Sequence, residues 1–101
     1  MRGKQKRYLR SQAQNMRPIF QIGKDGLSSK WLKEVENAVD KRELIKVNIL
    51  QNSLVETDEV EQFISENSDI QVVQKIGHVL VLYKRASKKE NRTYSTEVEA
   101  M

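Results

Sequence analysis

The apolar residues of this chain recur at helical spacing in three separate stretches. Leu9, Ala13 and Met16 stand at positions i, i+4 and i+7 of a stretch that contains neither glycine nor proline. Residues 31–39 carry a broader apolar face, and residues 60–64 carry a short one. Because this spacing brings apolar side chains to one side of an α-helix, it predicts three amphipathic helices.

Short polar residues mark where the second and third helices begin. Ser28 or Ser29 suits the N-cap of the second helix, because a serine hydroxyl can accept a hydrogen bond from an unpaired backbone N–H. Asp58, followed three residues later by Glu61, has the spacing of a capping box. We therefore expect the third helix to start near Asp58 and to end near Asn67.

Two short segments have the composition of β-strands. Residues 19–22 follow Pro18, which discourages a helix before it. Residues 45–49 alternate, so that isoleucine and valine side chains share one face of the strand and Lys46 projects from the other. A helical segment separates the two, and strand-helix-strand units favour right-handed crossovers and parallel pairing.

The last two β-rich segments, residues 70–76 and 79–85, are separated by Gly77 and His78. A two-residue loop with glycine first suits a tight hairpin, so this pair should be antiparallel. The elements then follow the order helix, strand, helix, strand, helix, strand, strand (αβαβαββ). The predicted fold class is α/β, a single-domain two-layer sandwich in which three helices pack against a mixed four-stranded sheet.

The length of 101 residues suits one compact domain. From Ala86 onward the composition turns polar, and apolar residues are only scattered. We therefore expect a domain over residues 1–86, followed by a polar, flexible C-terminal tail over residues 87–101.

The net charge of +4 is unevenly distributed along the chain. Residues 1–30 hold eight Lys or Arg and one acid, a charge of +7, whereas residues 31–70 hold four bases and ten acids, a charge of −6. Residues 71–101 carry the remaining +3. Such segregation predicts one basic and one acidic surface, and a basic surface attracts phosphate-rich polymers.

Several residue types that particular chemistries need are scarce or missing. The lack of cysteine excludes disulfides and thiolate sites, and a single histidine, His78, disfavours a zinc site. No apolar run approaches the roughly 18 residues of a membrane span, and the GxGxxG and Walker patterns of nucleotide-binding proteins are absent. We expect a cytoplasmic protein with no cofactor, no metal, no small-molecule substrate, no membrane contact and no enzymatic activity.

The sequence Gly23-Lys24-Asp25-Gly26 lies between a predicted strand and a predicted helix. Two glycines allow another backbone to approach closely, and the unpaired amides of a helix start attract anions. Lys24 in the loop and Lys30 in the first helical turn add full positive charges. Single-stranded RNA is clamped by a GxxG loop of this kind in KH domains. An ordinary tight turn has the same glycines, so that alternative stays open.

Four ordered motifs extend this pattern: residues 4–10 (KQKRYLR), 18–28 (PIFQIGKDGLS), 43–47 (ELIKV) and 76–84 (IGHVLVLYK). Together, over about residues 3–86, they resemble the CRM domain, named for chloroplast RNA splicing and ribosome maturation. The resemblance is closest to single-domain bacterial proteins of YhbY type, whose fold is similar to the C-terminal domain of bacterial translation initiation factor three. It implies an RNA-binding protein that associates with rRNA in precursors of the large ribosomal subunit. We expect this protein to be monomeric when free.

The RNA surface that the resemblance implies centres on the glycine loop, with basic residues of the first helix and nearby strands around it. The candidate contacts are Gly23, Lys24, Asp25, Gly26, Lys30, Arg17, Lys6, Arg7, Arg10, Lys46 and Lys84. If helices cover only one face of the sheet, the two strand lysines could join this surface. One position departs from the family pattern, because the residue after Gly77 is commonly arginine and here is His78.

Two other function classes remain open. The acidic middle third predicts a helical face on which a protein-protein adaptor of the ribosome could dock a basic partner. A hydrolase or nuclease is disfavoured by the lone histidine and by the absence of a nucleophile constellation. Trp31 and Phe63 are expected in the core, whereas Tyr8 could either pack or stack on a base.

Overall fold

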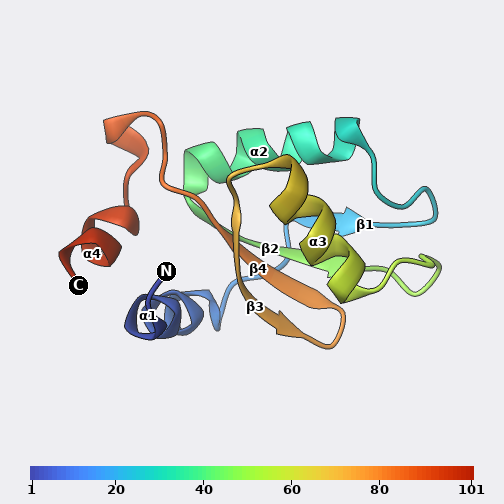
Figure 1. Cartoon of the computed structure of the whole chain (residues 1–101), viewed down its shortest axis with the longest axis horizontal. Helices are drawn as coiled ribbons and strands as arrows, with labels where there is room; N and C mark the ends of the chain where they lie inside the picture. Colours follow the sequence, from blue (N-terminus) through green and yellow to red (C-terminus); the bar gives the residue numbers. More distant parts are fainter.

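The computed structural model describes residues 1–101, and its elements begin in the predicted order (Figure 1). The helices are α1 (Gly3–Ala13), α2 (Ser29–Arg42), α3 (Thr57–Asn67) and α4 (Ser95–Ala100), with a 3₁₀ turn at Lys89–Asn91. The strands are β1 (Phe20–Ile22), β2 (Leu44–Ile49), β3 (Gln71–Ile76) and β4 (Val79–Tyr83). None of the helices has the length and apolar character that crossing a membrane requires.

The four strands form one mixed sheet in the order β1-β2-β4-β3. β1 runs parallel to β2, with Phe20 opposite Val47, while β2 and β3 each pair antiparallel with β4. The Gly77-His78 turn joins β3 to β4, and the His78 carbonyl accepts the backbone N–H of Ile49 at 2.8 Å. The mixed four-stranded sheet and its pairing directions are therefore as predicted.

One face of the sheet packs against α2 and α3. The apolar stripes of these helices contribute Val35, Val39, Val60 and Ile64, all fully buried, to the larger of two core clusters. The strands contribute the predicted alternating positions of β2 together with residues of β4 and the entry to β3: Ile45, Val47, Ile49, Ile70, Leu80 and Leu82. Each large apolar side chain buried in this way stabilises the fold by about 1.5–3 kcal/mol.

The opposite face of the sheet is covered in part, by α1 with α4 beside it (Figure 1). Leu9 and Ala13 of α1 and Val98 of α4 belong to a second buried cluster, which the strands complete with Leu44, Val73, Val81 and Tyr83. This partial third layer extends the two-layer arrangement expected from the sequence. The sequence feature that indicates this extra layer is the continuous apolar run of β4. Its side chains point alternately to both faces of the sheet, as is typical of a strand buried on both sides.

Residues 87–101 pack onto the domain, which corrects the expectation of a flexible tail. Ala86, Ser95 and Val98 are buried, and the Gln5 amide of α1 donates to the Val98 carbonyl at 2.8 Å. The segment is held mainly by Glu43, a fully buried residue that ends α2 with a φ of 66°. The sequence pattern missed this docking because the segment offers few apolar residues, and its backbone N–H groups provide most of the anchor.

The helix starts agree in part with the predicted caps. The Ser28 hydroxyl accepts the Trp31 N–H at 3.0 Å, so Ser28 and not Ser29 caps α2. The capping box of α3 is formed by Glu56 and Glu59 in place of the expected Asp58 and Glu61. Those two acids instead bind Lys75.

Candidate nucleic-acid interface

The Gly23-Lys24-Asp25-Gly26 turn connects β1 to α2 at one end of the molecule (Figure 1). The Gly26 N–H donates to the Gly23 carbonyl at 3.1 Å, which closes the turn. Gly26 has a φ of +68°, a conformation that only glycine adopts without strain. Gly23 has no positive φ. The sequence therefore needs glycine at the second position of the motif for backbone geometry.

A shallow hollow of about 300 Å³ lies between this turn and the first residues of α2. Lys24 and Lys30 line it, both exposed and neither in an ion pair. The backbone N–H groups of Ser29 and Lys30 have no partner in the chain, so the helix start presents free donors beside these cations. Asp25 and Glu34 also line the hollow and offset part of the positive charge.

Trp31 lies at the same hollow, half-buried. Its indole Nε1 donates to the Gln21 carbonyl at 3.1 Å, and its ring packs against the larger core cluster. The expectation of a core role is therefore confirmed, but one edge of the ring also borders the candidate site. Phe63 and Tyr8 are half-buried against the two core clusters, which favours packing for both.

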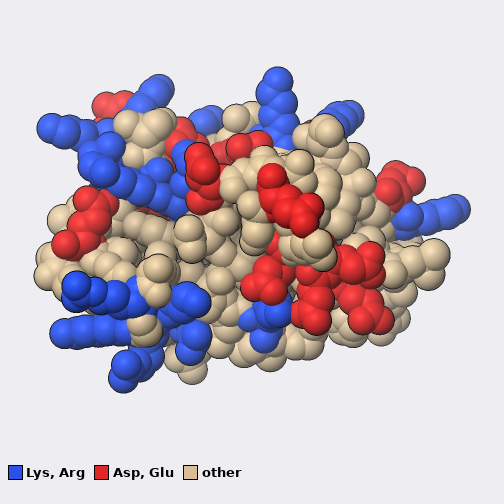
Figure 2. All heavy atoms as spheres, in the orientation of Figure 1, with Lys and Arg blue, Asp and Glu red and all other residues tan.

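The basic residues of α1 lie at the other end of the molecule (Figure 1). Figure 2 shows a group of Lys and Arg over α1, separated from the glycine turn on that face by acids over α3. Lys6, Arg7 and Arg10 are thus not brought together with Lys24 there. The single continuous basic surface expected from the sequence is therefore interrupted on this face, where further Lys and Arg lie over α2 and the C-terminal segment.

The three candidate cations of α1 have different surroundings. Arg7 is exposed and forms no ion pair. The Arg10 Nε donates to the Val73 carbonyl at 3.1 Å, so that this side chain is partly committed to β3. Lys6 lines a hollow together with Glu61 and Asp69, which reduces its attraction for phosphate.

The acids over α3 include the pair that the sequence assigned to a cap. The Lys75 ammonium lies 2.7 Å from a carboxylate oxygen of Asp58 and 2.7 Å from one of Glu61. The hydrogen bonds to Asp58 and Glu61 raise the pKa of Lys75 to about 12. One positive charge thus pairs with two carboxylates, so the surface of α3 stays negative.

The two strand lysines are engaged within the fold. Lys46 donates from Nζ to the carbonyls of Gln14 at 3.3 Å and Met16 at 3.0 Å, at the end of α1. Lys84 lies 3.3 Å from the carboxylate of Asp40. α1 and α4 cover only part of the second face of the sheet, and Lys46 borders an open hollow there with Arg10 and Gln74. A contact of these two lysines with RNA therefore stays a prediction.

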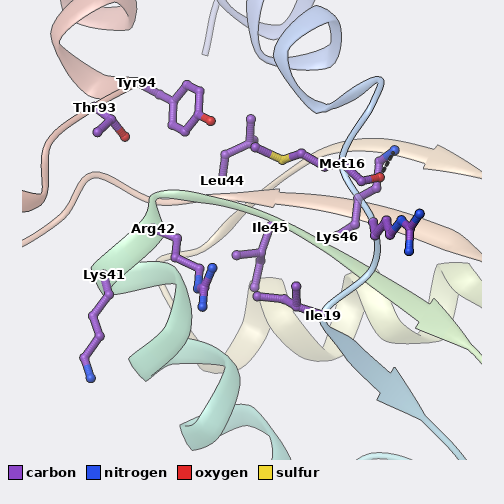
Figure 3. Close-up of a pocket in the computed structure, with 10 residues that line it drawn as sticks. Met16, Ile19, Lys41, Arg42, Leu44, Ile45, Lys46, Thr93 and Tyr94 are labelled. Carbon is purple, nitrogen blue, oxygen red and sulfur yellow. Dashed lines mark hydrogen bonds between the residues drawn. The ribbon is translucent and has the colours of Figure 1, made fainter.

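Arg17 borders a larger hollow, of about 490 Å³, between the ends of α1 and α2 and the C-terminal segment (Figure 3). Lys46 borders it as well, together with Lys41 and Arg42 of α2 and Tyr94. Lys41, Arg42 and Tyr94 are not among the residues that the sequence predicts for the interface. Lys41 and Arg42 have the composition of a solvated last helical turn, and nothing in the linear pattern places them beside Arg17.

No group of three or more His, Asp or Glu is arranged to hold a metal ion. The exposed lysines and arginines, the free helix-start amides and the two hollows give the surface several points that attract an anionic polymer.

Comparisons with known proteins agree with the motifs. The family model of the CRS1/YhbY (CRM) domain matches residues 1–84. The chain is 46% identical over 90 residues to the Bacillus subtilis protein named Probable RNA-binding protein YqeI, covering 89% of this chain and 92% of that protein. It is 36% identical over 81 residues to a Haemophilus influenzae protein named RNA-binding protein, covering 80% and 82% respectively.

The fold agrees with an experimental structure as well. The solution structure of the protein SAV1595 from Staphylococcus aureus matches with a TM-score of 0.73 and 41% sequence identity, covering 92% of this chain and 97% of that one. The sequence match over nearly the whole sheet domain, together with this fold, identifies the protein as a member of the CRS1/YhbY (CRM) domain family.

Proposed function

We propose that this protein binds RNA without chemically altering it, and that its target is rRNA in precursors of the large ribosomal subunit. Relatives named as RNA-binding proteins support the first part. The second part follows from the resemblance of the sequence motifs to the CRM domain, whose name includes ribosome maturation. The protein would act as a monomer in the cytoplasm, where such particles are assembled.

The observation that carries the proposal is the glycine turn beside the start of α2. Lys24, Lys30 and the free N–H groups of the first helical turn face one hollow, and each of them favours a phosphate oxygen. Contacts of this kind position the sugar–phosphate backbone and carry little sequence information. Affinity for RNA should therefore depend strongly on salt.

The exposed cations of α1 form a second contact region in this proposal. The molecule is 40 Å long, so an RNA that reaches both regions must follow its length. The acids of α3 repel phosphate on the face shown in Figure 2. The RNA would therefore pass over another face of the molecule. Arg17, which borders the larger hollow, is a further candidate contact.

The acidic face of α3 favours a second candidate function, a protein-protein adaptor on the ribosome (Figure 2). Glu59 is exposed and forms no ion pair, and only one of its carboxylate oxygens is engaged, by the Glu56 N–H of the capping box, so its charge still faces a basic partner. In an adaptor, reversing this charge with Glu59→Lys abolishes association with ribosomal particles, whereas changes in the glycine turn do not.

The deciding experiment compares two double variants with the same change in charge. Lys24→Ala combined with Lys30→Ala removes the cations of the turn, and Lys88→Ala combined with Lys89→Ala removes two exposed cations of the C-terminal segment. Fluorescence anisotropy titrations with large-subunit rRNA fragments are repeated over a series of salt concentrations. The turn variant should lose affinity, and its salt slope should fall by about 0.7–0.9 for each lost contact, while the control changes little.

A folded turn variant that binds rRNA as tightly as the parent would contradict the turn as a contact. Sedimentation of cell extracts tests the proposal that the target is rRNA in precursors of the large ribosomal subunit. Co-migration of the protein with immature large subunits is expected, and RNA affinity in vitro without such co-migration would contradict a role in assembly.

A further inference from the structure

The larger hollow combines free positive charge with an apolar floor. Arg17, Lys41 and Arg42 border it without any ion pair or side-chain hydrogen bond, and no acidic residue lines it. Lys46 also borders it, but donates to the carbonyls at the end of α1. An anionic ligand would therefore meet unneutralised guanidinium groups here.

The floor of the hollow is apolar and includes an aromatic ring. Figure 3 shows the Tyr94 ring directed toward Leu44 and Met16, while Arg42 points toward Ile45 and Ile19 and Lys41 points away. Ile19 is 44% exposed, so an apolar surface is open to solvent beside the cations. An apolar surface next to unpaired cations suits a ligand that has both a flat apolar part and a negative charge.

The Tyr94 side of the hollow is held in place by Glu43. A carboxylate oxygen of Glu43 accepts the backbone N–H groups of Thr93 at 2.7 Å and of Tyr94 at 2.8 Å. Glu43 faces the backbone of the C-terminal segment and is itself fully buried, so its charge is not exposed in the hollow. Docking of residues 87–101 thus completes a site that α1 and α2 alone would leave open on one side.

We propose that this hollow accepts one unpaired nucleotide of the bound RNA, with its base on the apolar floor beside Tyr94 and its phosphates held by Arg17 and Arg42. This inference rests on the proposed function and adds a base contact to backbone contacts that read little sequence. The volume of about 490 Å³ lies in the range of small-molecule sites. A base must be unstacked to enter, so the site selects single-stranded RNA over duplex.

The test uses the full chain and two oligonucleotides of equal length, one single-stranded and one a stable duplex. Tyr94→Leu keeps apolar bulk without an aromatic plane, and Tyr94→Phe keeps the ring. Arg17→Ala combined with Arg42→Ala removes two phosphate contacts. The turn variant Lys24→Ala with Lys30→Ala and the tail variant Lys88→Ala with Lys89→Ala serve as controls, and circular dichroism verifies that each is folded.

The variants should separate stacking from charge. Tyr94→Leu is expected to weaken single-strand binding about fivefold or more with an unchanged salt slope, and Tyr94→Phe to bind like the parent. The arginine variant should lower the single-strand salt slope by about 1.4, because each lost phosphate contact contributes about 0.7. Binding of the duplex should change much less for all three.

The outcomes that overturn this inference differ from those that overturn the proposed function. If the Tyr94→Leu and arginine variants bind like the parent while the turn variant is weakened, the hollow is not a nucleotide site and the proposed function stands. Equal losses for Tyr94→Leu and Tyr94→Phe would exclude stacking on the ring and also overturn the inference. If the parent binds neither oligonucleotide nor rRNA, the proposed function fails and this inference fails with it.

Discussion

The carboxylate of Glu43 accepts the backbone N–H of Tyr94 at 2.8 Å, across 51 positions of sequence. The same side chain also accepts the N–H groups of Ala86, Thr93 and Ser95 at 2.7–3.0 Å. Glu43 has a φ of 66°, a region that costs a residue with a Cβ about 1–2 kcal/mol. These hydrogen bonds offset that strain, so one side chain both ends α2 and anchors the C-terminal segment.

Replacing Glu43 should separate the anchor from the backbone strain. Glu43→Ala removes the acceptor of several buried N–H groups and keeps a Cβ at positive φ, so we expect a loss of about 2–3 kcal/mol in the free energy of unfolding. Glu43→Gly loses the same acceptor but relieves the strain, so it should be more stable than Glu43→Ala by about 1 kcal/mol. Urea unfolding measures both. Equal stability of the two variants would show that the backbone is not strained there.

Acid should release the C-terminal segment before the rest of the fold. The hydroxyl and N–H of Ser87 both donate to Asp40, and with Lys84 they lower its pKa from 3.8 to about 2. Burial raises the pKa of Glu43, but hydrogen bonds led by the Ala86 N–H outweigh burial and leave it lowered. A carboxyl with a lowered folded pKa stabilises the protein above its ordinary pKa, and that stability is lost as the pH falls through the folded value.

The expected window for Asp40 is therefore between pH 3.8 and about pH 2. The amide NMR signal of Ser87, which donates to Asp40, should shift toward its unfolded position in this range, whereas those of buried β4 residues should follow at lower pH. Asp40→Asn serves as the control, because it cannot titrate and should remove the Asp40 part of the transition. An amide signal of Ser87 that stays constant down to about pH 2 would contradict the hydrogen bonds that hold residues 87–101 on the domain through Asp40.

Local pattern was enough to predict the sheet and its first core. The spacing of Val35 and Val39 on α2 and the alternation of Ile45 and Val47 on β2 depend only on near neighbours in sequence, and both were identified correctly. The placement of the glycine turn between β1 and α2 was predicted for the same reason. Each of these features is encoded within about ten residues.

The features that sequence reasoning missed depend on distant residues. Glu43 is one of many acids in the middle of the chain, and only backbone N–H groups that follow some fifty residues later give it a role. Arg17 lies between α1 and β1, and Arg42 ends α2. The two border one hollow only because β1 pairs with β2, the strand that follows α2. The polar composition of residues 87–101 predicted mobility, since it does not reveal that a buried carboxylate binds their backbone.

Alanine at the two glycines of the turn should have unequal effects. Gly26→Ala places a Cβ at a φ of +68°, which should lower the free energy of unfolding by about 1 kcal/mol or more, although the new atom would lie an ordinary 3.5 Å from Val55. A Cβ on Gly23 would lie 3.6 Å from Leu50 with no positive φ, so Gly23→Ala should be nearly neutral. Thermal or urea unfolding compares them. Equal losses would contradict the conformation of this turn.

Lys46 should prove more important for stability than for RNA binding. Its ammonium donates to the Gln14 and Met16 carbonyls, so Lys46→Met leaves two carbonyls at the end of α1 without a charged donor while keeping most of the side-chain volume. We expect a loss of about 1.5 kcal/mol in the free energy of unfolding. In RNA titrations the salt slope of Lys46→Met should stay close to that of the parent, because the Lys46 ammonium is engaged within the fold. Lys24→Ala should instead lower the salt slope and leave the free energy of unfolding unchanged. A reversal of these two results would place Lys46 among the phosphate contacts and remove its structural role.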